Sequence, residues 1–61
     1  MKYYTVFLID GRMVTTKADG PEEAFFRAAK KEGYKFDLEN PSDIQAVVAK
    51  FSECVKSVEL G

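Results

Sequence analysis

Residues 3–18 read YYTVFLIDGRMVTTKA, two runs rich in aromatic and β-branched residues on either side of Asp10-Gly11. Aromatic and β-branched residues favour strands. Asp-Gly suits a two-residue type I′ turn, in which both central residues adopt positive φ. The stretch therefore predicts a β-hairpin with strands over about 3–9 and 12–18.

A two-residue loop at Asp10-Gly11 also predicts the register of this hairpin, with Leu8 facing Met13 and Phe7 facing Val14. One face of the hairpin then carries Tyr3, Thr5, Phe7, Ile9, Val14, Thr16 and Ala18. The opposite face carries Tyr4, Val6, Leu8, Met13, Thr15 and Lys17. We assign the first face to the core, because it is the more apolar and its second strand leads directly into the next element.

That next element is predicted to be a helix over about 21–32. Pro21 suits the first helical position, and Glu22 and Glu23 suit the positive end of the helix dipole. The apolar positions of this segment recur at helical spacing, and Glu23 can pair with Arg27 at i,i+4. Gly33 stands where a glycine ends many helices.

The C-terminal third predicts a second helix and a third strand. Asn40 and Pro41 resemble a helix cap and a first helical residue, and the apolar residues from Ile44 onward follow helical spacing. We predict a helix over about 41–51 and a strand over about 54–60. Two alternatives are one long helix to the C-terminus and a pair of strands. The whole chain is then one small α+β domain, residues 1–61.

The second hairpin face needs a separate explanation, because in its first strand it is entirely apolar, whereas an exposed sheet face is usually polar. The segment from Ile44 to Val58 could fold across it, or the two faces could be the reverse of our assignment. The hypothesis we adopt is a protein-interaction module that binds another protein or a second copy of the chain through this second hairpin face or through an open strand edge. Its predicted partner-binding residues are Tyr4, Val6, Leu8 and Met13.

The composition argues against an enzyme. The 61 residues include one cysteine and no histidine, so the commonest general base and metal ligand is missing. A histidine-activated nucleophile and a zinc site both require residues that this chain lacks. We expect no catalytic residue, no metal, no cofactor and no small-molecule substrate, and we interpret Cys54 as a small core residue.

Cysteine usage and hydropathy point to the cytoplasm. A single cysteine forms no intramolecular disulfide, whereas a secreted domain of this size normally needs several. The apolar stretch at the start ends at Asp10-Gly11, too short for a signal peptide, and no stretch is long enough to span a membrane. A chain of 61 residues also buries barely enough apolar surface to fold alone, so association would stabilise it.

The alternative function is nucleic-acid binding. Lys30, Lys31 and Lys35 cluster at the end of the first predicted helix, with Tyr34 or Phe36 as a stacking group. Nine basic residues against ten acidic ones argue against a broad basic surface. A hairpin followed by a helix that opens Pro-Glu-Glu-Ala also resembles a pattern in many small bacterial and phage-encoded proteins, some of which bind and inhibit host enzymes. The pattern names no family, and we transfer no residue from it.

Overall fold

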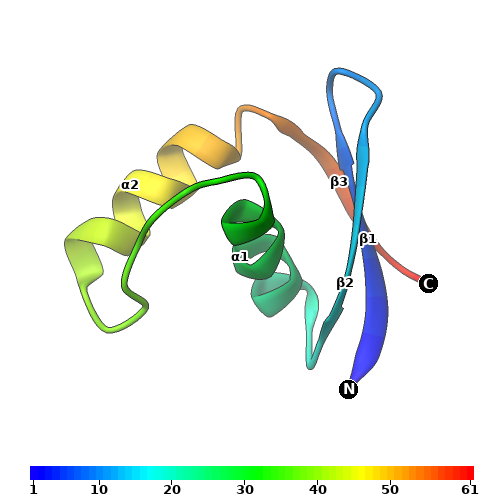
Figure 1. Ribbon diagram of the computed structural model, residues 1–61, viewed down its shortest axis with the longest axis horizontal. Helices are drawn as coiled ribbons and strands as arrows, with labels where there is room; N and C mark the ends of the chain where they lie inside the picture. The colour runs from blue at the N-terminus through cyan, green and yellow to red at the C-terminus, as the bar shows by residue number, and fades with distance from the viewer.

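The computed structural model describes residues 1–61 and confirms the predicted α+β fold (Figure 1). The elements are, in order, β1 (Lys2–Leu8), β2 (Met13–Ala18), α1 (Pro21–Lys31), α2 (Pro41–Phe51) and β3 (Val55–Leu60). The C-terminal third is thus a helix followed by a strand, neither one long helix nor a pair of strands. Neither helix has the length and apolarity that crossing a bilayer requires.

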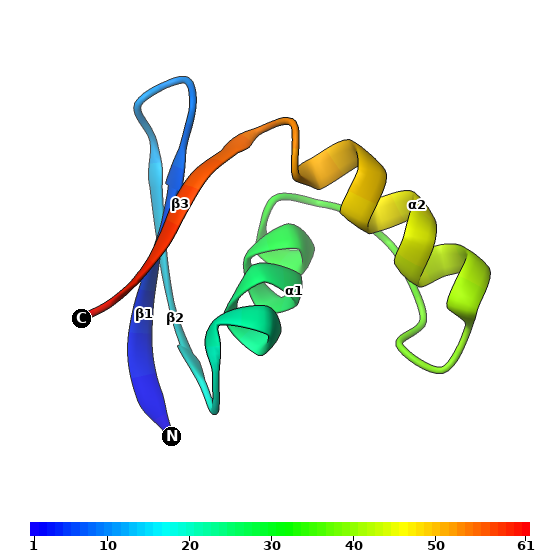
Figure 2. The same ribbon diagram turned by 180° about the vertical axis from the view of Figure 1, so that it is seen from behind.

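The three strands form one antiparallel sheet in the order β2-β1-β3, so that β1 is central and the other two are edges. A bulge interrupts the pairing of β1 with β3 between Phe7 and Leu8. Both helices lie on the same side of this sheet, and α1 lies between the sheet and α2 (Figures 1 and 2). The opposite side of the sheet is covered by no element of the chain.

The predicted two-residue turn is wrong, because the hairpin loop has three residues. The Leu8 amide donates to the Arg12 carbonyl at 2.9 Å, and the Gly11 amide donates to the Leu8 carbonyl at 3.1 Å. Only glycines have positive φ in this chain, so Asp10 cannot be a central residue of a type I′ turn. Gly11 instead takes φ +94° after an ordinary turn over Ile9 and Asp10, an arrangement typical of three-residue hairpin loops.

The extra loop residue shifts the register by one, so that Phe7 faces Met13 and Val6 faces Val14. A shift of one residue moves every side chain of a strand to the other face relative to its neighbour. The face assignment of β1 is therefore wrong as well. The side chains that β1 buries are Tyr4, Val6 and Leu8, whereas the predicted core residues Tyr3 and Ile9 are exposed.

β2 keeps its predicted face. Thr16 and Ala18 are buried and Val14 is half-buried, whereas Met13, Thr15 and Lys17 are exposed. The β1 faces are thus the reverse of our assignment. Val47 and Phe51, from the segment Ile44 to Val58 that is expected to cover this face, belong to the same core cluster as Val6 and Leu8. Two small clusters make up the core beneath α1. The larger contains Val6, Leu8, Ala28, Ala29, Val47 and Phe51, and the smaller Tyr4, Ala18 and Ala24.

The ends of both helices follow the predicted local chemistry. The Asn40 side chain accepts from the amides of Ser42 at 3.0 Å and Asp43 at 3.4 Å, which caps α2. At the end of α1, Gly33 has φ +99° and its amide donates to the Lys30 carbonyl at 3.1 Å. The next amide, that of Tyr34, reaches back to α1 at 3.0 Å, which completes a Schellman motif.

Aromatic rings attach α2 to the rest of the molecule. The ring of Phe51 lies 5.0 Å from that of Phe25 on α1 and 5.2 Å from that of Tyr34, centroid to centroid. Phe36, in the connection between the helices, lies 5.8 Å from Phe26. Tilted contacts at these distances are favourable for aromatic pairs. α2 is therefore fixed through side chains on α1 and its following loop.

Candidate interaction surface

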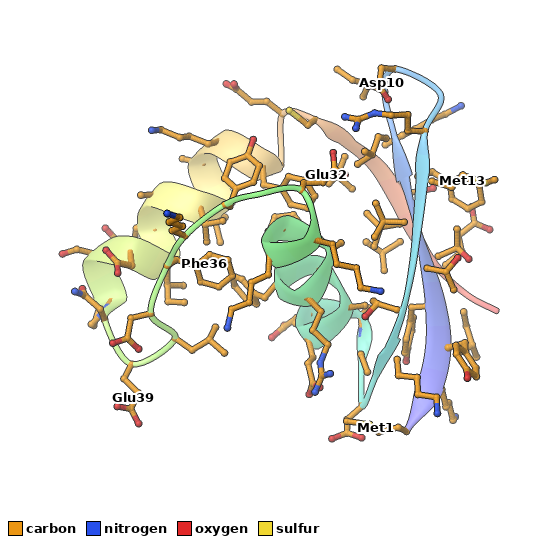
Figure 3. The ribbon with its side chains drawn as sticks, viewed as in Figure 1. Met1, Asp10, Met13, Glu32, Phe36 and Glu39 are labelled. Atoms are coloured by element: carbon orange, nitrogen blue, oxygen red, sulfur yellow. The ribbon has the colours of Figure 1, made fainter.

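The side of the sheet opposite the helices is covered by no element of the chain (Figures 1 and 2). The register places eight side chains on it, and we call this set the open sheet face: Tyr3, Thr5, Phe7, Met13, Thr15, Lys17, Ser57 and Glu59. Figure 3 shows Met13 directed away from α1, while Glu32 and Phe36 lie on the helix side. The open sheet face is thus separated from the core by the sheet itself.

Three of the eight side chains of the open sheet face, Tyr3, Phe7 and Met13, are large and apolar or aromatic. Tyr3 is 57% exposed and Met13 is 64% exposed, with Phe7 half-buried between the flanking strands. Ile9, in the adjoining hairpin loop, is 67% exposed. Phe7 and Met13 face each other on neighbouring strands, whereas Thr5 and Thr15 separate them from Tyr3. Exposed apolar side chains on an uncovered sheet side mark a candidate interaction site.

Polar side chains of the open sheet face lie on all three strands. On β1, the Thr5 hydroxyl donates to the Gly61 carbonyl at 2.7 Å, and the charged residues lie on the two edge strands. Lys17 on β2 holds its ammonium nitrogen 5.1 Å from the centre of the Tyr3 ring, a cation–π geometry. On β3, the Ser57 hydroxyl donates to the Glu59 carboxylate at 3.2 Å. The face thus has Tyr3 at one end, Phe7 and Met13 at the other and the polar row Thr15, Thr5 and Glu59 between them. It carries a cation on one margin and a carboxylate on the other.

Of the four predicted partner-binding residues, the structure places only Met13 on an accessible surface. Tyr4, Val6 and Leu8 are buried beneath α1 at 8%, 0% and 3% exposure. Met13 lies on the opposite side of the sheet, so the four residues do not form one surface. Sequence reasoning missed Tyr3 and Phe7 because it assigned them to the core; the possible three-residue loop at Ile9-Asp10-Gly11 was the signal that could have found them.

The two open strand edges are partly blocked. The ammonium group of Lys31 on α1 donates to the Thr15 carbonyl of β2 at 2.8 Å. The bulge in β3 brings Lys56 to the other edge, without a residue opposite it in β1. Lysines and bulges are devices that protect strand edges from pairing with other chains. The face therefore offers a more accessible contact than either edge.

The lysine cluster predicted for nucleic-acid binding is dispersed by contacts within the chain. Lys31 is engaged with β2, as described above, and Lys30 holds its ammonium 5.4 Å from the centre of the Phe36 ring. Phe36 and Tyr34 are themselves half-buried against other aromatic rings, and desolvation raises the pKa of Tyr34. Lys35 is exposed.

The hairpin loop is tied to the end of α1 through one guanidinium group. Arg12 contacts the Asp10 carboxylate at 2.7 Å and the Glu32 carboxylate at 2.8 Å. The backbone amide and the side chain of Arg12 both donate to Asp10, which lowers the pKa of that carboxyl. The same side-chain hydrogen bond raises the pKa of Arg12. These contacts stabilise the three-residue loop that determines the register.

A second surface feature is a shallow groove of about 470 Å³ between the two helices. Its lining residues are Pro21, Glu22, Phe25, Phe26, Val48 and Ser52. The groove is mostly apolar and has no convergent set of polar groups of the kind that selects a small ligand. No three cysteine or acidic side chains gather anywhere in the chain in a way that could hold a metal ion.

Comparison with known proteins gives no relative from which a function could be transferred. No family model, no curated protein and no solved structure matches the chain. The argument for function therefore depends on the open sheet face and its residues.

Proposed function

We propose that this chain is a small, non-enzymatic protein-interaction module that binds through the open sheet face. The observation that carries the proposal is an uncovered sheet side that presents an exposed Tyr3 and a half-buried Phe7 beside an exposed Met13. Burying apolar surface contributes about 25 cal/mol per Å², so a protein that covers this side gains its main stabilisation there. The partner is another protein or a second copy of the chain, and the lysine cluster is not part of this surface.

The face is preferred to the edges because edge pairing would have to displace Lys31 from Thr15 or accommodate the β3 bulge. We assign this function to the cytoplasm, since Cys54 is a free thiol and free thiols persist in a reducing compartment. The absence of histidine supports the non-enzymatic assignment.

The test is site-specific photo-crosslinking in living cells of the source organism. A photoreactive amino acid replaces Met13 on the open sheet face in one variant and Gln45, an exposed residue of α2, in the control. We expect a discrete protein adduct from position 13 that position 45 does not give. Adding Phe7→Lys to the first variant should abolish the adduct, while circular dichroism shows the fold retained. Equal adducts from both positions, or none from position 13, would contradict the proposal.

A further inference from the structure

We infer that the partner of the open sheet face is a second copy of this chain, packed face to face. The two-fold axis lies between the two sheets and is parallel to β1. This inference rests on the proposed function and goes further by naming the partner. It is argued from the distribution of charge on the face, from the order of the strands and from the area that the face offers.

The two charged residues that the register places on the open sheet face lie on opposite margins. Lys17 faces Tyr3 from β2, and Glu59 faces Thr5 from β3. β1 lies between them and contributes no charge to the face, only Tyr3, Thr5 and Phe7. The open sheet face therefore carries a positive charge on the β2 side of its central strand and a negative charge on the β3 side, two residues further along.

A two-fold axis along β1 exchanges the margins. It places β2 of one copy over β3 of the other, so that Lys17 of each copy approaches Glu59 of the other copy. Lys17 is level with Tyr3 and Glu59 is level with Thr5, so the two side chains are offset by two residues, about 7 Å, along the strand direction. Packed sheets lie about 10 Å apart. Extended lysine and glutamate side chains can together span that separation. The contact forms twice, as two-fold symmetry requires.

A two-fold axis perpendicular to the strands, in the plane between the sheets, would not bring opposite charges together. It would place β2 over the β2 of the other copy, and Lys17 would lose its carboxylate partner. Packed sheets keep their strand directions within about 30° of each other, which both axes allow, so the charges decide between them. Lys56, in the bulge of β3, lies towards the other end of that strand from Glu59.

The area available predicts a weak dimer. A standard interface buries about 800 Å² per partner, about a fifth of the 4229 Å² that this molecule exposes. Three strands about 4.8 Å apart and about 20 Å long offer roughly 300 Å² in projection. Two copies together would bury about 600 Å², less than the roughly 1,000 Å² of a stable interface, so the dimer is transient. Such a dimer should dissociate on dilution through the micromolar range.

The experiment is a pair of charge reversals, Lys17→Glu and Glu59→Lys, studied separately and mixed by sedimentation velocity. In a homodimer of either variant two like-charged contacts replace the two ion pairs, and we expect its dissociation constant to rise at least tenfold. In a mixed dimer both opposite-charge contacts form again, so an equimolar mixture should associate about as tightly as the unmodified chain. Added salt should weaken the unmodified dimer.

The matched control is Glu39→Lys, the same reversal in the connection between the helices and far from the sheet (Figure 3). This variant should dimerise as the unmodified chain does. The inference is overturned if the unmodified chain stays monomeric at millimolar concentration, or if mixing the two variants restores nothing. A monomer whose position 13 crosslinks to a different protein would overturn the dimer and leave the proposed function standing, whereas position 13 without any adduct would contradict both.

Discussion

Leu8 and Ile9 are adjacent apolar residues, and the reversed faces of β1 predict opposite consequences for truncating them. Leu8 is 3% exposed in the main core cluster, whereas Ile9 is 67% exposed in the hairpin loop. Buried leucine-to-alanine changes cost about 2–5 kcal/mol. Exposed substitutions away from special features change stability by about 0.5 kcal/mol or less. A domain of 61 residues has a total stability of about 3–9 kcal/mol, so Leu8→Ala should remove a large fraction of it.

The assay is thermal and urea unfolding followed by circular dichroism, at a concentration low enough that self-association adds no stability. For a domain of this size, 1 kcal/mol shifts Tm by about 4–8 °C. We therefore expect Leu8→Ala to lower Tm by at least about 8 °C and Ile9→Ala to leave it nearly unchanged. If Ile9→Ala destabilised the chain as much as Leu8→Ala does, the three-residue loop and the face assignment derived from it would be wrong.

Three further predictions test the loop and the helix cap. Gly11→Ala should cost about 1–2 kcal/mol in urea unfolding, because φ is +94° and the added methyl group meets no atom within 4 Å, so the cost is conformational; an unchanged midpoint would contradict this backbone conformation. Asn40→Ala should cost about 1 kcal/mol by the same measurement through loss of the α2 cap. Asn40→Asp should keep most of the stabilisation that the cap provides. The Asp10 carboxyl should titrate below its ordinary range in an NMR pH titration. Because the pKa of Asp10 is lower in the folded chain, the stabilisation from its carboxylate is present above the unfolded pKa and is lost as the pH falls through the folded pKa. Arg12→Ala should raise the Asp10 pKa only part of the way to the ordinary range, because the backbone amide of residue 12, the larger cause, still donates to the carboxylate.

The helices could be predicted closely from sequence because their signals are local. Each signal acts within a few residues of a helix end. Asn40 caps α2, Pro41 is its first residue, and Gly33 follows the C-terminal end of α1. The predicted ranges 21–32 and 41–51 differ from the structure by one residue in total. The pair formed by Glu23 and Arg27, at 2.7 Å, is likewise a local i,i+4 interaction.

The face of β1 could not be predicted in the same way. β2 alternates in polarity, so Thr16 and Ala18 identify its core side under either loop length. β1 is apolar on both sides, and such a pattern leaves its orientation to the loop. Asp-Gly is compatible both with a two-residue type I′ turn and with a three-residue loop that ends in a glycine of positive φ. In the folded chain the three-residue loop turns Tyr4, Val6 and Leu8 into the core and brings Arg12 to Glu32 at the end of α1, and both are contacts between residues far apart in the sequence.

The interaction hypothesis does not depend on which face of β1 is buried. Because both faces of the strand are apolar, covering one leaves the other in water. The chain has only two helices, and both lie on the same side of the sheet (Figures 1 and 2). The connection from β2 to α1 spans residues 19–20 and that from α2 to β3 spans residues 52–54, so both helices stay close to the strands that they follow or precede. Within these 61 residues no element covers Tyr3, Phe7 and Met13, so these side chains are available to a partner.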